Sequence, residues 1–112
     1  MATTTVNLIP SKYAESSQTT QYTATDVVSI IDKFTVTNIT SGTNATITVN
    51  LVVLAATASD SNIVLDSQTV GYGDTYKCPE LVGHVLQPGS FISTICSNSS
   101  TLVIRCSGRE IS

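Results

Sequence analysis

The chain has 112 residues, which is enough for one domain that buries most of its unfolded surface and too few for two. Charged residues make up 12% of the chain, whereas serine and threonine together number 33, so the solvent-facing surface is rich in hydroxyl groups. The net charge of -3 and the five scattered basic residues argue against binding to nucleic acid, which requires clustered lysine and arginine.

The first 21 residues are predicted to form a strand and an arm, attached to a sandwich that spans residues 22–112 of the same domain. Thr3–Ile9 can form a strand that ends at Pro10, and the polar Ser11–Gln21 is typical of an arm or long loop that could reach a neighbouring subunit. This start has neither a basic segment nor a long apolar stretch. We therefore expect no secretory signal and no membrane partner, and a product that stays soluble where it is made.

The stretch Asp32–Leu54 has the pattern of a β-hairpin, in which apolar and polar residues alternate along both arms. Ser41–Asn44 supplies residues that favour a turn between the arms. The alternation ends after Leu51, because Val52 and Leu54 are apolar as well. We expect both faces of this strand end to be covered, and we predict Val52 and Leu54 as residues of an interface between copies of the chain.

The second half of the chain continues the pattern of short strands separated by turns. Further strands are expected at Ile63–Val70, Thr75–Cys78, Phe91–Ser97 and from Leu102 onward, with a loop at Ala55–Asn62 and a β-turn at Gln87–Ser90. A last hairpin, with its turn at Asn98–Ser100, would place Leu102, Ile104 and Cys106 on the inward face. The sequence therefore predicts an all-β, single-domain antiparallel β-sandwich of about eight short strands, similar to a jelly roll.

The three cysteines are an odd number in a chain without an export signal, which favours buried thiols over disulfide bonds. In the predicted hairpin Cys96 lies opposite Leu102, and Cys106 is then about 13 Å away along the strand, beyond the reach of a disulfide. Cys78 lies at the end of a predicted strand, next to Pro79. It is the cysteine that we expect to be exposed, as a candidate interface residue.

His84 is the only histidine, and no partner for a catalytic triad or a metal site is evident in the sequence. We predict it as a polar residue at a strand entry or a subunit contact, and we include it among the candidate interface residues. No catalytic residue, cofactor or metal site is predicted, so we expect that the chain is not an enzyme.

Several turns and the closing strand form a recognisable set of segments: Tyr22–Ala24, Ile31–Asn38, Gly73–Tyr76, Leu86–Ile92 and Leu102–Ile111. Taken together, these segments resemble those of small virion proteins of tailed bacteriophages. The resemblance implies a non-enzymatic virion protein, made in the host cytoplasm, that acts as a capsid decoration or cement subunit. Its expected partners are copies of itself and the major capsid protein. The alternatives are a neck or tail accessory protein, or a receptor- or carbohydrate-binding module, although the chain has no tryptophan.

Overall fold

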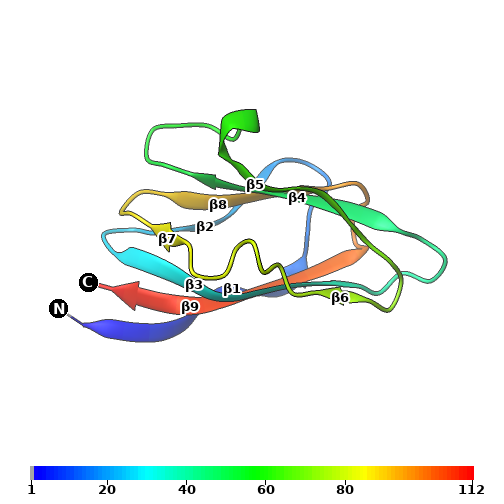
Figure 1. The fold of residues 1–112 in the computed structure, drawn as a ribbon, viewed down its shortest axis with the longest axis horizontal. Coiled ribbons are helices and arrows are strands. Elements are labelled where there is room, and N and C mark those ends of the chain that lie inside the picture. The colour runs from blue at the N-terminus through cyan, green and yellow to red at the C-terminus, as the bar shows by residue number, and fades with distance from the viewer. Residues whose placement is uncertain (1) are drawn as a thin grey trace.

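The computed structural model describes residues 2–112, which form two antiparallel β-sheets packed face to face (Figure 1). Within these residues there is one 3-10 turn, η1 (Asp60–Asn62), and there are nine strands: β1 (Thr3–Tyr13), β2 (Thr19–Thr23), β3 (Val28–Asn38), β4 (Ala45–Val52), β5 (Ile63–Val70), β6 (Thr75–Tyr76), β7 (Val85–Leu86), β8 (Phe91–Cys96) and β9 (Leu102–Ile111). No helix in the described residues is long and apolar enough to cross a membrane.

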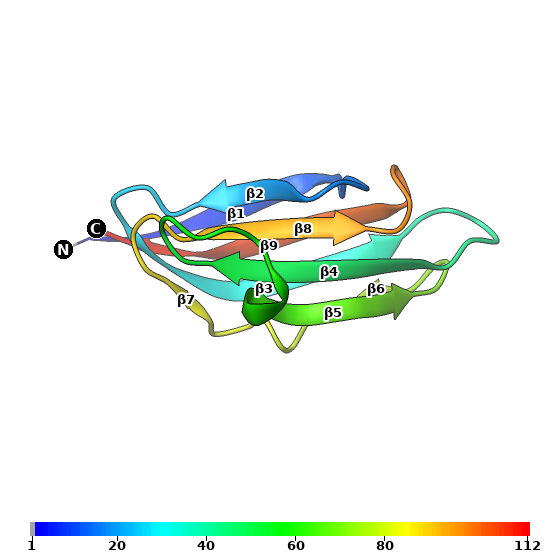
Figure 2. The same cartoon turned by 90° about the horizontal axis from the view of Figure 1, so that it is seen from above.

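The two sheets have the strand orders β1-β9-β3-β6 and β2-β8-β4-β5, and the short β7 also pairs with β3 (Figure 2). We refer to them as the β1 sheet and the β2 sheet. β4 and β5 form a hairpin within the β2 sheet, and β6 and β7 both pair with β3, but every other pair of consecutive strands lies in opposite sheets, which is the order of a jelly roll. The predicted sandwich and its jelly-roll character are therefore confirmed. The ninth strand arises because β6 and β7 are two separate pieces of one edge along β3.

The predicted hairpin over Asp32–Leu54 is wrong, because its two arms lie in different sheets. The first arm is β3, which pairs with β9, β6 and β7, and the second is β4, which pairs with β5 and β8. The segment 39–44 crosses from one sheet to the other instead of reversing the chain within a sheet. The alternating pattern correctly identified the buried faces of both strands, but it does not specify the strand with which each one pairs.

The predicted hairpin around Asn98–Ser100 is wrong for the same reason. Cys96 pairs with Ile47 in the β2 sheet, whereas Leu102 pairs with Asn38 in the β1 sheet. The predicted inward face of β9 is correct, since Leu102, Ile104 and Cys106 are each 0% exposed.

The N-terminal segment is not an extended arm, because it contributes two strands to the sandwich. β1 pairs with β9 along its length, and a register irregularity between Ile9 and Lys12 accommodates Pro10 on this edge strand. β2 pairs with β8. The turn between β1 and β2 is held by a hydrogen bond from the amide of Cys96 to the carbonyl of Glu15, at 3.1 Å. The residues expected to reach a neighbour therefore pack on their own subunit.

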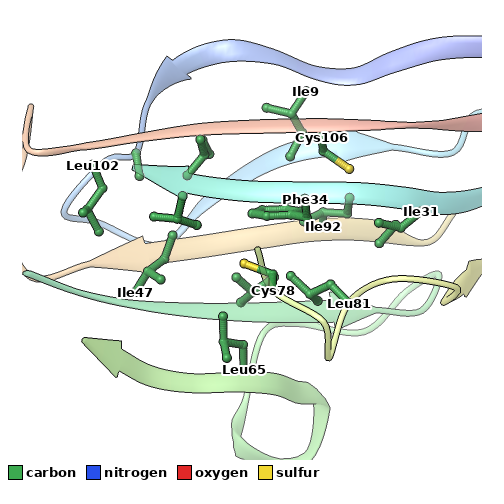
Figure 3. Packing of buried hydrophobic residues seen from close by; sticks show 14 of the residues in the cluster. Ile9, Ile31, Phe34, Ile47, Leu65, Cys78, Leu81, Ile92, Leu102 and Cys106 are labelled. Carbon is green, nitrogen blue, oxygen red and sulfur yellow. The ribbon is translucent and has the colours of Figure 1, made fainter. Parts of the chain in front are cut away.

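The core between the sheets is built from apolar side chains of both layers around Phe34, with Ile31 from the same strand, Ile47 from β4 and Ile92 from β8 (Figure 3). The loop between β6 and β7 leaves the sheet edge and places Cys78 and Leu81 in this core, where both are 0% exposed. Bonds from Gly83 N to Ile31 O (2.7 Å) and from Ile31 N to His84 O (3.0 Å) hold the loop against β3. The loop itself consists of hydrogen-bonded turns, with bonds from Leu81 N to Cys78 O (3.0 Å) and from His84 N to Leu81 O (3.3 Å).

Candidate interaction surfaces

The described residues offer no group of three or more histidine, cysteine, aspartate or glutamate side chains that could hold a metal ion. His84 lies in the loop beside β3 with an exposed side chain. Its backbone groups form hydrogen bonds with Leu81 and Ile31, which fix the path of the loop.

Two of the four predicted interface residues are buried within the subunit. Val52 and Cys78 are each 0% exposed, whereas Leu54 is 69% exposed and His84 is also exposed. The expectation that Cys78 is exposed is wrong, because its loop turns into the core. Leu54 and His84 remain accessible, and their role in an interface stays a prediction.

The cover over Val52 is the chain itself. Asn50, on the same face of β4, donates from Nδ2 to the carbonyl of Ser59 at 2.9 Å and to Oδ1 of Asn62 at 2.7 Å. The loop between β4 and β5 is thereby folded back over the outer side of the β2 sheet (Figure 1). The predicted cover is therefore present over Val52, where no second subunit is needed, but it does not extend to Leu54, which is 69% exposed.

Leu54 forms one wall of a shallow groove of about 380 Å³ that is also lined by Thr23–Asp26 and Pro88–Gly89. The predicted β-turn closes one side, with a bond from Ser90 N to Gln87 O at 2.9 Å. A Cβ atom at Gly89 would lie 2.6 Å from Cδ1 of Leu54, and the φ angle of Gly89 is +88°. Glycine at this position therefore allows Leu54 to pack closely over the turn.

The large apolar side chains that are exposed gather toward the two ends of the sandwich, which are seen side-on in Figure 2. We call the end with the chain termini the terminal end. It comprises loops 24–27, 53–62 and 87–90 with the adjacent residues 82–86. Its exposed large apolar side chains are those of Val53, Leu54, Val82 and Val85. The opposite, distal end comprises loops 14–18, 39–44, 71–74 and 97–101, and it exposes Ile39, Tyr72 and Tyr13, the last residue of β1.

Sequence reasoning missed Ile39 and Tyr72 as surface residues. Ile39 lies within the span of the predicted hairpin Asp32–Leu54, which is wrong. Tyr72 lies between two glycines, and the sequence predicts no role for it. A signal was present in both cases: Tyr72 stands between Gly71 and Gly73, and Ile39 precedes the turn residues Thr40–Asn44. A large apolar residue inside a tight turn has no sheet face to pack on and tends to project into solvent.

The distal end is fixed by Asn38, which is 0% exposed. Its side-chain amide donates to the carbonyls of Thr43 at 2.7 Å and Val70 at 2.8 Å, and its Oδ1 accepts the amide of Thr40 at 2.9 Å. Val70 belongs to the β2 sheet, so Asn38 ties the two sheets together. Its backbone carbonyl also accepts the amide of Gly73 at 2.9 Å, which positions the neighbouring Tyr72 loop.

The terminal end has a corresponding tie at Tyr22. The Tyr22 hydroxyl donates to Oε2 of Glu110 and accepts from Oγ of Ser29 at 2.6 Å, which joins β2 of one sheet to β9 and β3 of the other. Burial, and then the bond to the Glu110 carboxylate, raise the pKa of Tyr22 to about 12. The phenol therefore keeps its proton in the folded protein at neutral pH.

All three cysteines are free and buried: Cys78 and Cys106 are 0% exposed and Cys96 is 5% exposed. Burial raises the pKa of Cys78 and of Cys106 to about 12, and it also raises the pKa of Cys96. Since the thiolate is the reactive form, these thiols are poor nucleophiles at neutral pH. Cys96 and Cys106 lie in opposite sheets, so the hairpin register predicted above is not the reason that they are unbonded.

The sandwich has free strand edges in both sheets. β1 pairs with β9 on one side only, and β2 and β5 form the edges of the other sheet. Lys12 and Pro10 protect the end of β1, but Thr3–Ile9 carries no charged residue. This part of β1 is able to pair with a strand of another chain.

No protein-family model matches the sequence, and no curated protein matches it. Among solved structures the fold is similar to that of a protein of Bacillus endospore appendages, described as a novel family of disulfide-linked pili. The two chains are 8% identical, with a TM-score of 0.56, and the match covers 98% of this chain and 88% of the other. At this identity the likeness concerns the fold.

This match overturns the resemblance to phage virion proteins and what it implied, which was capsid decoration or cement, a neck or tail accessory, a capsid partner and a place on the virion. It also overturns the competing assignment to a receptor- or carbohydrate-binding module. The physical reason lies in the segments that carried the resemblance. Gly71–Asp74 closes through a bond from Asp74 N to Gly71 O at 3.0 Å, and Gln87–Ser90 is a β-turn with Pro88 and Gly89 at its centre. Such turns serve any β-sandwich and carry no information on the particle to which it belongs.

Proposed function

We propose that this chain is a structural subunit that assembles with copies of itself into a fibre, and that it acts through subunit contacts and not through catalysis. The observation that carries the proposal is the likeness to a pilus protein over nearly the whole of both chains. That protein belongs to appendages of Bacillus endospores, so an exposed surface of a cell or spore is the corresponding location for a fibre of this chain.

Features of the chain itself support repeated self-contact. The uncharged part of β1, Thr3–Ile9, offers unpaired backbone groups at a sheet edge. The surface has few charges that would repel another copy, since charged residues are 12% of the chain. A contact between two different patches of one subunit repeats from copy to copy and generates a filament when it does not close into a ring.

The contacts proposed for this chain are non-covalent. The matched protein belongs to disulfide-linked pili, whereas the three thiols of this chain lie inside the sandwich. A disulfide between subunits would require the core to open around Cys78 or Cys106. We therefore expect assemblies that come apart in denaturant without reductant, and three alkylatable thiols per chain after unfolding without reductant, measured by mass spectrometry.

Light scattering across a concentration series, with negative-stain electron microscopy of the most concentrated sample, tests the proposal. We expect the average mass to rise with concentration and filaments of uniform width to appear. A strict monomer at every concentration, under conditions where circular dichroism reports folded β-structure, would contradict the proposed function.

A further inference from the structure

The two ends of the sandwich differ from its broad faces in a way that the fold does not require. Of the seven exposed large apolar side chains of the described residues, five lie in or next to the loops at the two ends: Tyr13, Ile39, Val53, Leu54 and Tyr72. Val82 and Val85 lie along the sheet edge beside Ile31 and Ile30 of β3, and none of the seven lies on the outer faces. The outer faces present residues such as Thr35, Thr46 and Thr48 instead. Apolar side chains left in water at loop tips contribute nothing to the core, and clusters of them mark contact sites.

The two ends have complementary shapes, because one has a groove and the other has projecting side chains. The terminal end has the groove between Leu54, Ala24 and Pro88. The distal end has projecting side chains, Ile39 and Tyr72, on two loops joined by the bond from Gly73 N to Asn38 O at 2.9 Å. Because Asn38 is buried and holds three side-chain hydrogen bonds, these loops form a firm base for the projecting residues.

We infer that the terminal end of one copy receives the distal end of the next, with Tyr72 and Ile39 seated against Leu54 and the groove beside it. This inference rests on the proposed function, because it specifies how copies in the fibre meet along the long axis. The contact is heterologous, since it joins two different surfaces, and it repeats along a filament when it does not close into a ring.

The size of the ends sets the strength of this contact. The molecule measures 47 × 27 × 20 Å, so an end offers a cross-section of roughly 540 Å², and two opposed ends bury about 1,100 Å² in total. That area lies near the lower limit for a specific interface, about 1,000 Å². The end-to-end contact is therefore weak in isolation, and it adds to side-by-side contacts in a fibre.

Two variants of the full chain, Leu54→Asp and Tyr72→Asp, test the inference. Leu54 is 69% and Tyr72 56% exposed, so neither change disturbs the core, and circular dichroism verifies the fold. Thr35→Asp, in the middle of an outer face on a central strand, is the matched control. Sedimentation velocity measures association, and small-angle scattering measures the longest dimension of the complexes.

Each end variant alone is expected to associate at least tenfold more weakly than the wild type, while Thr35→Asp associates like it. A mixture of the two end variants should form one-to-one end-to-end pairs about twice 47 Å long that do not grow further along the long axis, since each variant retains one intact end. If the wild type assembles and either end variant assembles equally well, the inference is wrong while the proposed function stands. The inference is also wrong if the mixed variants form no dimer, or form dimers no longer than a single subunit. A wild type that never associates contradicts both the inference and the proposed function.

Discussion

The two ends of the sandwich each carry a polar tie between the sheets, and the two ties differ in chemistry. At the distal end Asn38 is 0% exposed and bonds to backbone groups by neutral hydrogen bonds. At the terminal end Tyr22 is half-buried and bonds to the carboxylate of Glu110 and the hydroxyl of Ser29. The first tie contains no titratable group, whereas the second joins a phenol to an acid.

The two ends of this fold are therefore held together by different kinds of hydrogen bond. The distal crossing is a short segment whose backbone groups cannot all reach a strand, so a buried amide side chain satisfies them. The tie at the terminal end only has to connect strands that are already paired, since β2 pairs with β8 and β3 pairs with β9. We therefore expect the distal tie to contribute more stability and to be insensitive to pH.

The largest effect is expected for Asn38→Ala. The change leaves the carbonyls of Thr43 and Val70 and the amide of Thr40 without their partner, and we expect the free energy of unfolding to fall by about 2–4 kcal/mol. Urea unfolding at neutral pH measures the loss. Asn44→Ala, an exposed residue of the same crossing, is the control and should change stability by less than about 0.5 kcal/mol. Equal losses in the two variants would contradict the role assigned to Asn38.

A smaller loss, about 1–2 kcal/mol, is expected for Tyr22→Phe. The ring keeps its packing, but Glu110 loses a donor and Ser29, which is 0% exposed, loses an acceptor. The same urea experiment measures this loss. A loss that exceeds that of Asn38→Ala would reverse the comparison between the ends.

The pH dependence separates the two ties further. Below about pH 10 the folded and unfolded chains both hold the phenol proton, so the stabilisation by Tyr22 is complete. Between pH 10 and about pH 12 the unfolded chain releases this proton while the folded chain keeps it, so the free energy of unfolding falls as pH rises. The advantage of the wild type over Tyr22→Phe should shrink across this range. The buried thiols lower stability in both proteins alike, from about pH 9 upward. A constant difference between the two proteins would argue against the Tyr22 to Glu110 bond.

The next effect concerns the groove at the terminal end. In Gly89→Ala the new methyl group meets Leu54, and the residue keeps a positive φ angle, so we expect a loss of about 1 kcal/mol. Gly42→Ala, at a φ angle of +75° with no neighbour within 4 Å, measures the backbone contribution alone. If the two variants lose the same stability, Leu54 does not pack on Gly89 in solution.

The smallest effect on stability is expected for Leu54→Asp, within about 0.5 kcal/mol, because the side chain is 69% exposed in the single subunit. The thermal midpoint of a dilute sample measures it. A larger loss would mean that Leu54 belongs to the fold and not to a surface available for contact.

The sequence by itself determined the class of fold and the inward faces of the strands. Alternation along Phe34–Thr37 and Leu102–Cys106 follows from the two-residue period of a strand, which is a local property of the backbone. The turn at Gln87–Ser90 was also readable, because proline and glycine restrict or permit particular backbone angles at their own positions.

Only the tertiary structure decided which strands pair and which residues remain on the surface. Packed sheets are about 10 Å apart and paired strands about 5 Å apart, and a segment of the length of 39–44 can span either distance. Whether this segment joins two paired strands or crosses between the sheets depends on contacts between residues far apart in the sequence. Examples are the bond from Asn38 to Val70 and the pairing of β3 with β9. The same remote contacts buried Cys78 and Val52 and left Leu54, Ile39 and Tyr72 exposed, because burial depends on what the rest of the chain places over a residue.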